Sequence, residues 1–122
     1  MRASKMNLYE ADVFLRRTLT KTKYEAVNRR GLEFDLHSGY LLKLLQDQNG
    51  KCALTGWDLE FTRGGDFGSG TNPMSCSIDR KDNQVGYVPS NVQLVCWKAN
   101  KNKNSLSDAE FKELCKAVAN HA

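Results

Sequence analysis

Residues 77–103 read SIDRKDNQVGYVPSNVQLVCWKANKNK, and this stretch decides the fold. Two apolar runs flank a loop rich in Asp, Asn, Gly and Pro, and a basic, Asn-rich segment follows. The pattern predicts a strand, a loop, a return strand and then a helix. Asp79 ends the first predicted strand and Asn100 lies inside the predicted helix. A carboxylate and an amide oxygen brought together can hold one hard divalent cation, and a cation beside lysines suggests phosphate chemistry.

The composition is that of one soluble globular domain. The chain has 122 residues, is 40% hydrophobic and 26% charged, and carries a formal net charge of +4. This mild positive balance permits nucleic-acid binding without establishing it. No apolar run is long enough to span a bilayer, and residues 1–12 lack the apolar centre of a signal peptide. We therefore expect a cytoplasmic protein, in the host cytoplasm if a phage encodes it.

The four cysteines are Cys52, Cys76, Cys96 and Cys115, and none belongs to a Cys-x-x-Cys pair. A four-thiolate zinc site is therefore disfavoured. In a reducing compartment the thiols should be free. We expect all four to be small, buried, apolar residues.

The N-terminal region is predicted to be helical and basic. Residues 9–17 and 23–30 read as two helices interrupted over 18–22, and Gly31 suits the left-handed position after the last turn. The arginines and lysines here allow two interpretations. One is a solvated helix face, and the other is an arm that contacts phosphates.

The remaining elements follow from local patterns. Residues 32–36 read as a short extended piece, and residues 38–48 read as a helix capped by Ser38, with His37 as a surface cap before it. Strands are expected over 57–61, 75–79 and 91–96, and a helix over 97–104. Residues 63–73 read as a flexible surface loop, and its glycines lack the Lys-Ser/Thr ending of a P-loop. Ser107 and Glu110 form a capping box. The helix that follows carries an apolar stripe expected to lie in the core: Phe111, Leu114, Cys115 and Val118.

Several of these pieces together resemble a known family. The pieces are GKCALTG at 50–56, SIDR at 77–80, Gly86-Tyr87, NVQ at 91–93, and then Cys96, Asn100 and Lys103. This joint spacing resembles HNH endonucleases, in particular the small phage-type members of the His-Me finger superfamily, from about Leu32 to the C-terminus. The resemblance implies an α+β, ββα-metal fold in which a hairpin-helix core is wrapped by helices. Residues 1–31 would then be a basic helical N-terminal arm, and residues 32–122 the HNH-like nuclease domain.

The resemblance also assigns roles to single residues. Asp79 and Asn100 match metal ligands for Mg²⁺ or Mn²⁺, and Asn91 matches an Asn that braces the loop between the strands. Lys103 matches a basic residue near the phosphate. Expected contacts to the nucleic acid are Arg29, Arg30, Lys98 and Lys101.

Two departures from the family pattern stand out. The zinc knuckles of many members read here Cys52-Ala-Leu-Thr55 and Cys96-Trp-Lys-Ala99, so one thiol of each pair is missing and no structural zinc is expected. The position of the general-base His is occupied by Arg80, which cannot accept a proton near neutral pH. Its natural role is to bind a phosphate or brace a carboxylate. Asp82 is the remaining candidate base in the loop.

The function predicted on these grounds is metal-dependent hydrolysis of phosphodiester bonds in DNA, most naturally double-stranded. The alternative is a catalytically inactive nucleic-acid-binding module that retains the HNH fold. A third possibility is a small interaction protein with an incidental basic surface. An EF-hand is disfavoured, since Lys81 falls where its loop needs an oxygen ligand. The oligomeric state stays open.

Overall fold

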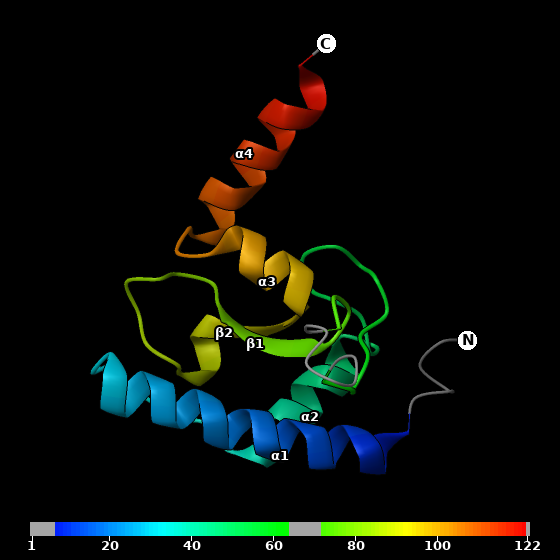
Figure 1. Ribbon diagram of the computed structural model, residues 1–122, viewed down its shortest axis with the longest axis vertical. Coiled ribbons are helices and arrows are strands. Elements are labelled where there is room, and N and C mark those ends of the chain that lie inside the picture. The colour runs from blue at the N-terminus through cyan, green and yellow to red at the C-terminus, as the bar shows by residue number, and fades with distance from the viewer. Residues whose placement is uncertain (1–6, 64–71, 122) are drawn as a thin grey trace.

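The computed structural model describes residues 7–63 and 72–121. Its elements confirm the predicted α+β class, a hairpin and a helix wrapped by further helices (Figure 1). In chain order they are α1 (Leu8–Tyr24), a π-helical turn (Glu25–Arg29), α2 (Ser38–Asp47), β1 (Cys76–Arg80), a 3-10 turn (Pro89–Asn91), β2 (Val92–Cys96), α3 (Trp97–Lys103) and α4 (Asp108–Asn120).

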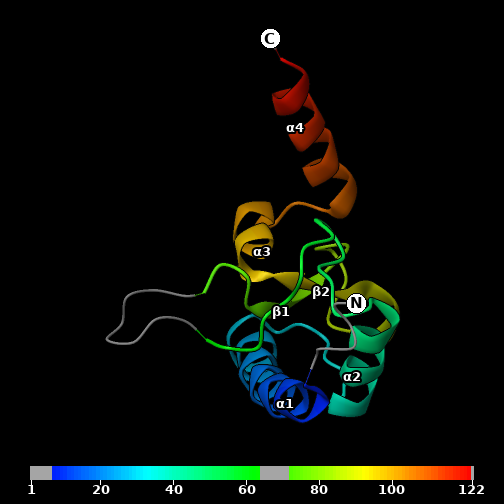
Figure 2. The same ribbon diagram turned by 90° about the vertical axis from the view of Figure 1, so that its right-hand side faces the viewer.

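The two strands form an antiparallel hairpin with α3 directly after it. The register runs from Cys76 opposite Cys96 to Arg80 opposite Val92. All five residues of β2 are buried, because helices cover both faces of the hairpin. Figures 1 and 2 show α1 and α2 beneath the strands and α3 on the other side. A two-stranded sheet is marginal alone, so this packing supplies its stability.

One hydrophobic core joins the N-terminal helix to the rest of the chain. Ala11 and Leu15 of α1 are fully buried with Leu41 and Leu45 of α2 and Leu94 of β2. Burial of a leucine side chain contributes about 1.5–3 kcal/mol. The segment read as a basic arm is thus anchored by its apolar face, and only its charged face is free to meet a ligand.

The predicted interruption of the first helix is wrong. Helix α1 runs without a break through Thr18, Thr20 and Thr22. The Thr20 hydroxyl donates to the Arg16 carbonyl at 3.1 Å, so a polar side chain is satisfied inside the helix. Threonine costs only a few tenths of a kcal/mol in a helix, and packing of α1 on the core outweighs this. Gly31 has φ +64°, which confirms the predicted left-handed position.

Helix α2 is capped one residue earlier than Ser38. The His37 side chain accepts the Tyr40 N–H at 3.2 Å, which confirms His37 as a surface cap and corrects the assignment to Ser38. The strand expected over 57–61 is reduced to isolated bridges, Lys51 with Asp58 and Glu60 with Ser75. Of the glycine-rich loop predicted over 63–73, residues 64–71 lie outside the described residues.

Helix α4 begins with the predicted capping box but does not pack into the core. Ser107 and Glu110 exchange hydrogen bonds at 2.9 and 3.2 Å. The expected core stripe is wrong: α4 has no buried residue, Leu114 is 50% exposed and Val118 is 70% exposed. Cys115 is exposed as well, against the expectation that all four thiols are buried. Both ribbon views show α4 projecting away from the other elements (Figures 1 and 2).

No helix within the described ranges has the length and apolarity needed to cross a membrane.

Candidate nucleic-acid site on the hairpin

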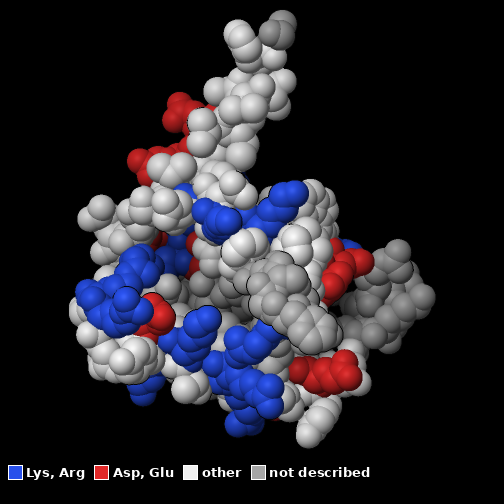
Figure 3. Space-filling model, in the orientation of Figure 1, with Lys and Arg blue, Asp and Glu red and all other residues white. Residues whose placement is uncertain are grey.

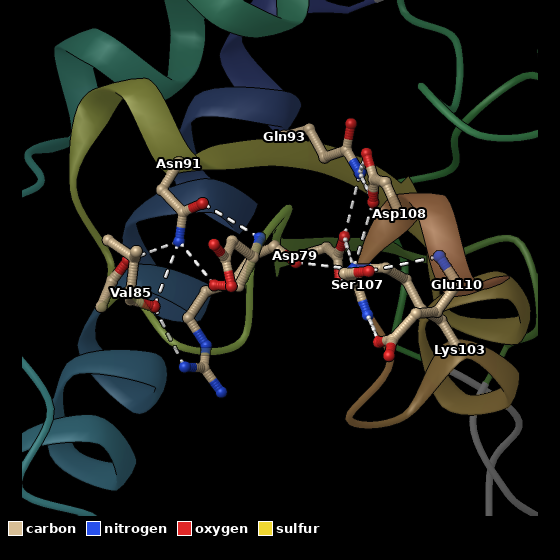
Figure 4. A network of polar contacts seen from close by, with 11 residues as sticks. Asp79, Val85, Asn91, Gln93, Lys103, Ser107, Asp108 and Glu110 are labelled. Atoms are coloured by element: carbon tan, nitrogen blue, oxygen red, sulfur yellow. Dashed lines mark hydrogen bonds and ion pairs between the residues drawn. The ribbon is translucent and has the colours of Figure 1, made fainter. Parts of the chain in front are cut away.

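The loop between β1 and β2 is held by the side chain of Asn91. Its Nδ2 donates to the carbonyls of Asp82, Val85 and Gly86 at 3.0, 3.1 and 3.0 Å. Its Oδ1 accepts the Asp82 N–H at 3.0 Å. Figure 4 shows this amide pointing into the loop. One buried side chain thereby ties both ends of the loop together, which is a structural role.

The same loop is pressed against the segment after α1. A Cβ atom at Gly86 would lie 2.4 Å from the Glu33 carbonyl oxygen, so the close approach requires glycine. Next to it, the Tyr87 N–H donates to the Glu33 carbonyl and the Asp35 N–H to the Tyr87 carbonyl, both at 2.8 Å. These contacts hold the chain after α1, which includes Arg30, next to the loop between β1 and β2.

Arg80 braces the loop as well. Its Nη1 donates to the Asn83 and Val85 carbonyls at 2.9 and 3.1 Å, and its guanidinium lies 5.3 Å from the centre of the Tyr87 ring. With Nη1 engaged, the remaining N–H groups are left to contact an anion. Arg80 is thus fixed in place as a positive charge beside Asp79.

An open pocket of about 380 Å³ lies between the end of β1, the chain after α1 and α3. A second hollow of about 350 Å³ shares Arg30, Tyr87, Trp97 and Asn100 with it, so the two form one groove. The groove brings together side chains from four parts of the chain, and five of these side chains are cationic: Lys21, Arg30, Arg63, Arg80 and Lys101. Figure 3 shows lysine and arginine side chains gathered on this face over α1 and α3. Such a groove attracts the phosphates of a nucleic acid.

Asp79 lies at the bottom of the pocket and is paired with Lys103. The Lys103 ammonium lies 2.9 Å from Oδ2 and 3.2 Å from Oδ1 of Asp79, and Gln93 Nε2 donates to the same Oδ2 at 3.0 Å (Figure 4). Burial raises the pKa of the Asp79 carboxyl, while the hydrogen bonds from Gln93 and Lys103 and the charge of Lys103 act against that rise. Asp79 is therefore a buried carboxylate with a resident counter-charge.

The structure places Lys103, predicted to lie near the phosphate, in the interior and outside the lining of the pocket. Its side chain is only 1% exposed, and its ammonium also donates to the Arg80 carbonyl at 2.6 Å and lies 3.2 Å from Asp108 Oδ1. Buried lysines need such partners, because an unpaired buried charge is costly. Lys103 is a structural cation at the bottom of the site.

The structure divides the other predicted residues into two groups. Arg30, Lys101 and Asn100 line the pocket with Asp79 and Arg80, as one site requires. Lys98 instead lines a separate apolar groove near α4, and Arg29 is exposed on the π-helical turn with Glu25 3.7 Å away. Lys98 therefore does not lie at the pocket.

The candidate base Asp82 does not line the pocket either. It is exposed, and its Oδ1 accepts the Gln84 N–H at 2.9 Å within the same loop. Among the described residues that line the pocket there is no histidine, and Asp79 is the only carboxylate.

Seven of the twelve described residues that line the pocket were not predicted as site residues, and four of the seven are amide or aromatic side chains. Asn83 and Asn104 add amides, Tyr87 supplies the ring under Arg80, and Trp97 carries the Lys101 ammonium 4.9 Å from its centre. The bonds from Gln93 and Asp108 to Asp79 and Lys103 were also missed. Only the alternation of β2 hinted that Gln93 is special, as the one polar side chain in an apolar strand.

Two side chains of the pocket, Asp79 and Asn100, carry oxygen atoms of the type that bind hard divalent ions. Among the described residues no group of three or more His, Cys, Asp and Glu side chains could hold a metal. One carboxylate and one amide oxygen do suit Mg²⁺ or Mn²⁺, which proteins commonly hold through one or two carboxylates together with substrate phosphates. Asp79 and Asn100 line one open pocket and carry oxygen atoms of this kind, and both Asp79 oxygens accept from the Lys103 ammonium.

Three of the four cysteines, Cys52, Cys76 and Cys96, lie close together in the core. Cys52 Sγ accepts the N–H groups of Thr55 at 3.4 Å and Cys96 at 3.3 Å, and Cys76 lies opposite Cys96 in the hairpin. Burial opposes ionisation of Cys52, but hydrogen bonds from the Thr55 side chain and from the backbone of Cys96, Thr55 and Leu54 outweigh it and lower the pKa of Cys52. Burial raises the pKa of Cys76 and Cys96. The absence of structural zinc stays a prediction.

Comparison with known proteins identifies the fold. The sequence matches no protein-family profile and no curated protein. The structure is similar to that of the rare-cutting HNH restriction endonuclease PacI, with a TM-score of 0.60 and 22% sequence identity over 84% of this chain and 74% of that one. The chain thus has an HNH-type nuclease fold, as the sequence resemblance predicted.

Proposed function

We propose that this protein is an endonuclease that hydrolyses DNA phosphodiester bonds with the help of Mg²⁺ or Mn²⁺. The observation that carries the proposal is the convergence of Asp79, Arg80 and Asn100 with Arg30 and Lys101 in one open pocket. The HNH-type fold supports the reaction class, because PacI is described as a restriction endonuclease that perturbs DNA.

The cationic pocket residues would bind phosphates, and the oxygen-bearing residues would hold the ion. Arg30 and Lys101, at its rim, would bind phosphates of the DNA backbone. Arg80, held by two carbonyls and the Tyr87 ring, would present its free N–H groups to the scissile phosphate. Asp79 and Asn100 would hold the ion, which when bound supplies Lewis-acid stabilisation of charge on that phosphate.

The candidate proton acceptor is Asp82. Arg80 cannot accept a proton, and Asp79 is paired with Lys103. Asp82 would have to act from the rim of the loop, since it does not line the pocket. Loss of nicking in Asp82→Asn would support that role, and full activity would exclude it.

A plasmid-nicking assay tests the proposal. Supercoiled double-stranded DNA should be nicked with Mg²⁺ or Mn²⁺, and EDTA should stop the reaction. Asp79→Asn should lower the rate by about 100-fold or more, because loss of the carboxylate that holds the ion removes the electrostatic stabilisation of the phosphate. Glu113→Gln, an exposed change on α4, is the control. Equal nicking by wild type and Asp79→Asn at matched ion concentration would refute the assignment of Asp79.

A specific observation favours a second candidate function. Arg80 replaces a base, and Asp79 is neutralised by Lys103, so the pocket is also suited to binding nucleic acid without cutting it. Such a module would shift the mobility of DNA in EDTA and nick no substrate with any divalent metal. A protein that neither shifts nor nicks DNA or RNA would be an interaction protein.

A further inference from the structure

The Lys103 ammonium occupies a cation-binding position made of oxygen atoms. Both oxygens of Asp79 lie within 3.2 Å of it, the Arg80 carbonyl accepts from it at 2.6 Å, and Asp108 Oδ1 lies 3.2 Å away. Figure 4 shows Lys103 reaching Asp79 from α3 while Asp108 approaches from the start of α4. Carboxylate and carbonyl oxygens are also the ligands of hard divalent cations. The Lys103 ammonium and a divalent ion would thus bind the same carboxylate, that of Asp79.

The charges around Lys103 do not balance. Asp79 and Asp108 share this one ammonium, so the hydrogen-bonded set of Asp79, Gln93, Lys103 and Asp108 holds two carboxylates and one cation, with Arg80 outside it. Gln93 Nε2 bridges the two carboxylates, at 3.0 Å from Asp79 Oδ2 and at 3.0 and 3.1 Å from the Asp108 oxygens. A second cation at Asp79 would balance the second carboxylate of this set. Lys103 could then keep Asp108 and the Arg80 carbonyl as partners, so its charge would not be left alone.

We propose that Lys103 competes with a divalent cation for Asp79, and that Asp108 favours the divalent cation by retaining Lys103 when the ion binds. Asp108 is thus a positioning residue that acts on Asp79 through Lys103. It also links α4 to the site, since Asp108 is the first residue of that helix and its N–H donates to the Lys81 carbonyl at 3.0 Å. This inference rests on the proposed role of Asp79 as an ion ligand.

The test measures binding of Mn²⁺ alone, by the electron paramagnetic resonance signal of the free ion. The proteins are wild type, Lys103→Met, Asp108→Asn and the double variant, with Glu113→Gln as a matched control on α4. Lys103→Met should bind Mn²⁺ about 10-fold more tightly and Asp108→Asn about 10-fold more weakly, as expected for coupled charges in one network. In the Lys103→Met background, Asp108→Asn should have no further effect. Asp108→Glu should restore most of the affinity.

Folding is controlled separately, because Lys103→Met leaves Asp79 buried without its counter-charge. Circular dichroism and thermal melting show which variants fold. If Lys103→Met does not fold, Lys103→Gln replaces it, since an amide can still donate to Asp79 without a charge.

Each outcome decides the inference. Unchanged or weaker Mn²⁺ binding in the folded Lys103 variant overturns the competition. An effect of Asp108→Asn that persists in the double variant overturns its action through Lys103, because Asp108 would then act as a simple charge. Mn²⁺ bound by Lys103→Met but not by wild type supports the inference and refutes the proposed metal enzyme. Binding and nicking by wild type with no change in Lys103→Met refutes the inference alone. No binding by any variant refutes both.

Discussion

Replacement of Asn91 by alanine should destabilise the whole hairpin. Asn91 is only 7% exposed, and its amide makes four hydrogen bonds to the loop backbone. A hydrogen bond contributes about 1 kcal/mol net, and a buried carbonyl left without a donor costs about 1–3 kcal/mol. Each of the three carbonyls keeps a second donor, namely the Val88 N–H for Gly86, Arg80 Nη1 for Val85 and the Val85 N–H for Asp82, so the loss comes from the four hydrogen bonds themselves. The expected loss for Asn91→Ala is about 2–4 kcal/mol.

Urea unfolding followed by tryptophan fluorescence measures this loss. For a domain of this size, 1 kcal/mol shifts the melting temperature by about 4 °C, so the melting point should fall by about 8–16 °C. Gln84→Ala is the control, since Gln84 is exposed in the same loop, and it should stay within about 0.5 kcal/mol of wild type. A loss below about 1 kcal/mol for Asn91→Ala would refute the reasoning, because the loop would then be held by other contacts.

Further predictions concern the binding face, the loop and the exposed helix. Arg30→Ala should reduce the log–log salt slope of DNA binding by about 0.9, while Arg29→Ala should change it less, since only Arg30 lines the pocket; equal effects would contradict the groove. Gly86→Ala should lower stability by more than about 3 kcal/mol in urea unfolding, because its Cβ would meet the Glu33 carbonyl, and a small change would mean that the loop can shift. Leu114→Ala should alter stability by less than about 0.5 kcal/mol, against about 2–5 kcal/mol for Leu41→Ala, and a large loss at Leu114 would show that α4 packs on the core. Elemental analysis should find no stoichiometric zinc; about one zinc per chain, lost together with the fold on chelation, would contradict this.

Local patterns determined the elements of the site. The apolar alternation before Asp79 and after Asn91 predicted the hairpin, and Ser107 and Glu110 predicted the start of α4, because these signals act between residues near in sequence. The same patterns placed Asp79 and Asn100 on neighbouring elements, and the structure puts both in one pocket.

Local patterns gave wrong predictions where contacts with residues distant in sequence determine burial or helix continuity. The stripe from Phe111 to Val118 has helical spacing, and spacing does not tell whether another surface covers it. Thr18 and Thr22 disfavour a helix only slightly, and packing of α1 on the core overrides them.

The tertiary structure alone decided what Lys103 does. In the sequence Lys103 is one of several lysines on a basic helix, and each would be read as a surface charge. In the fold it is buried against Asp79 and Asp108, which the chain brings in from β1 and from the start of α4. A residue type determines the charge of a side chain, whereas burial and partners determine whether that charge faces a ligand or another residue of the same chain.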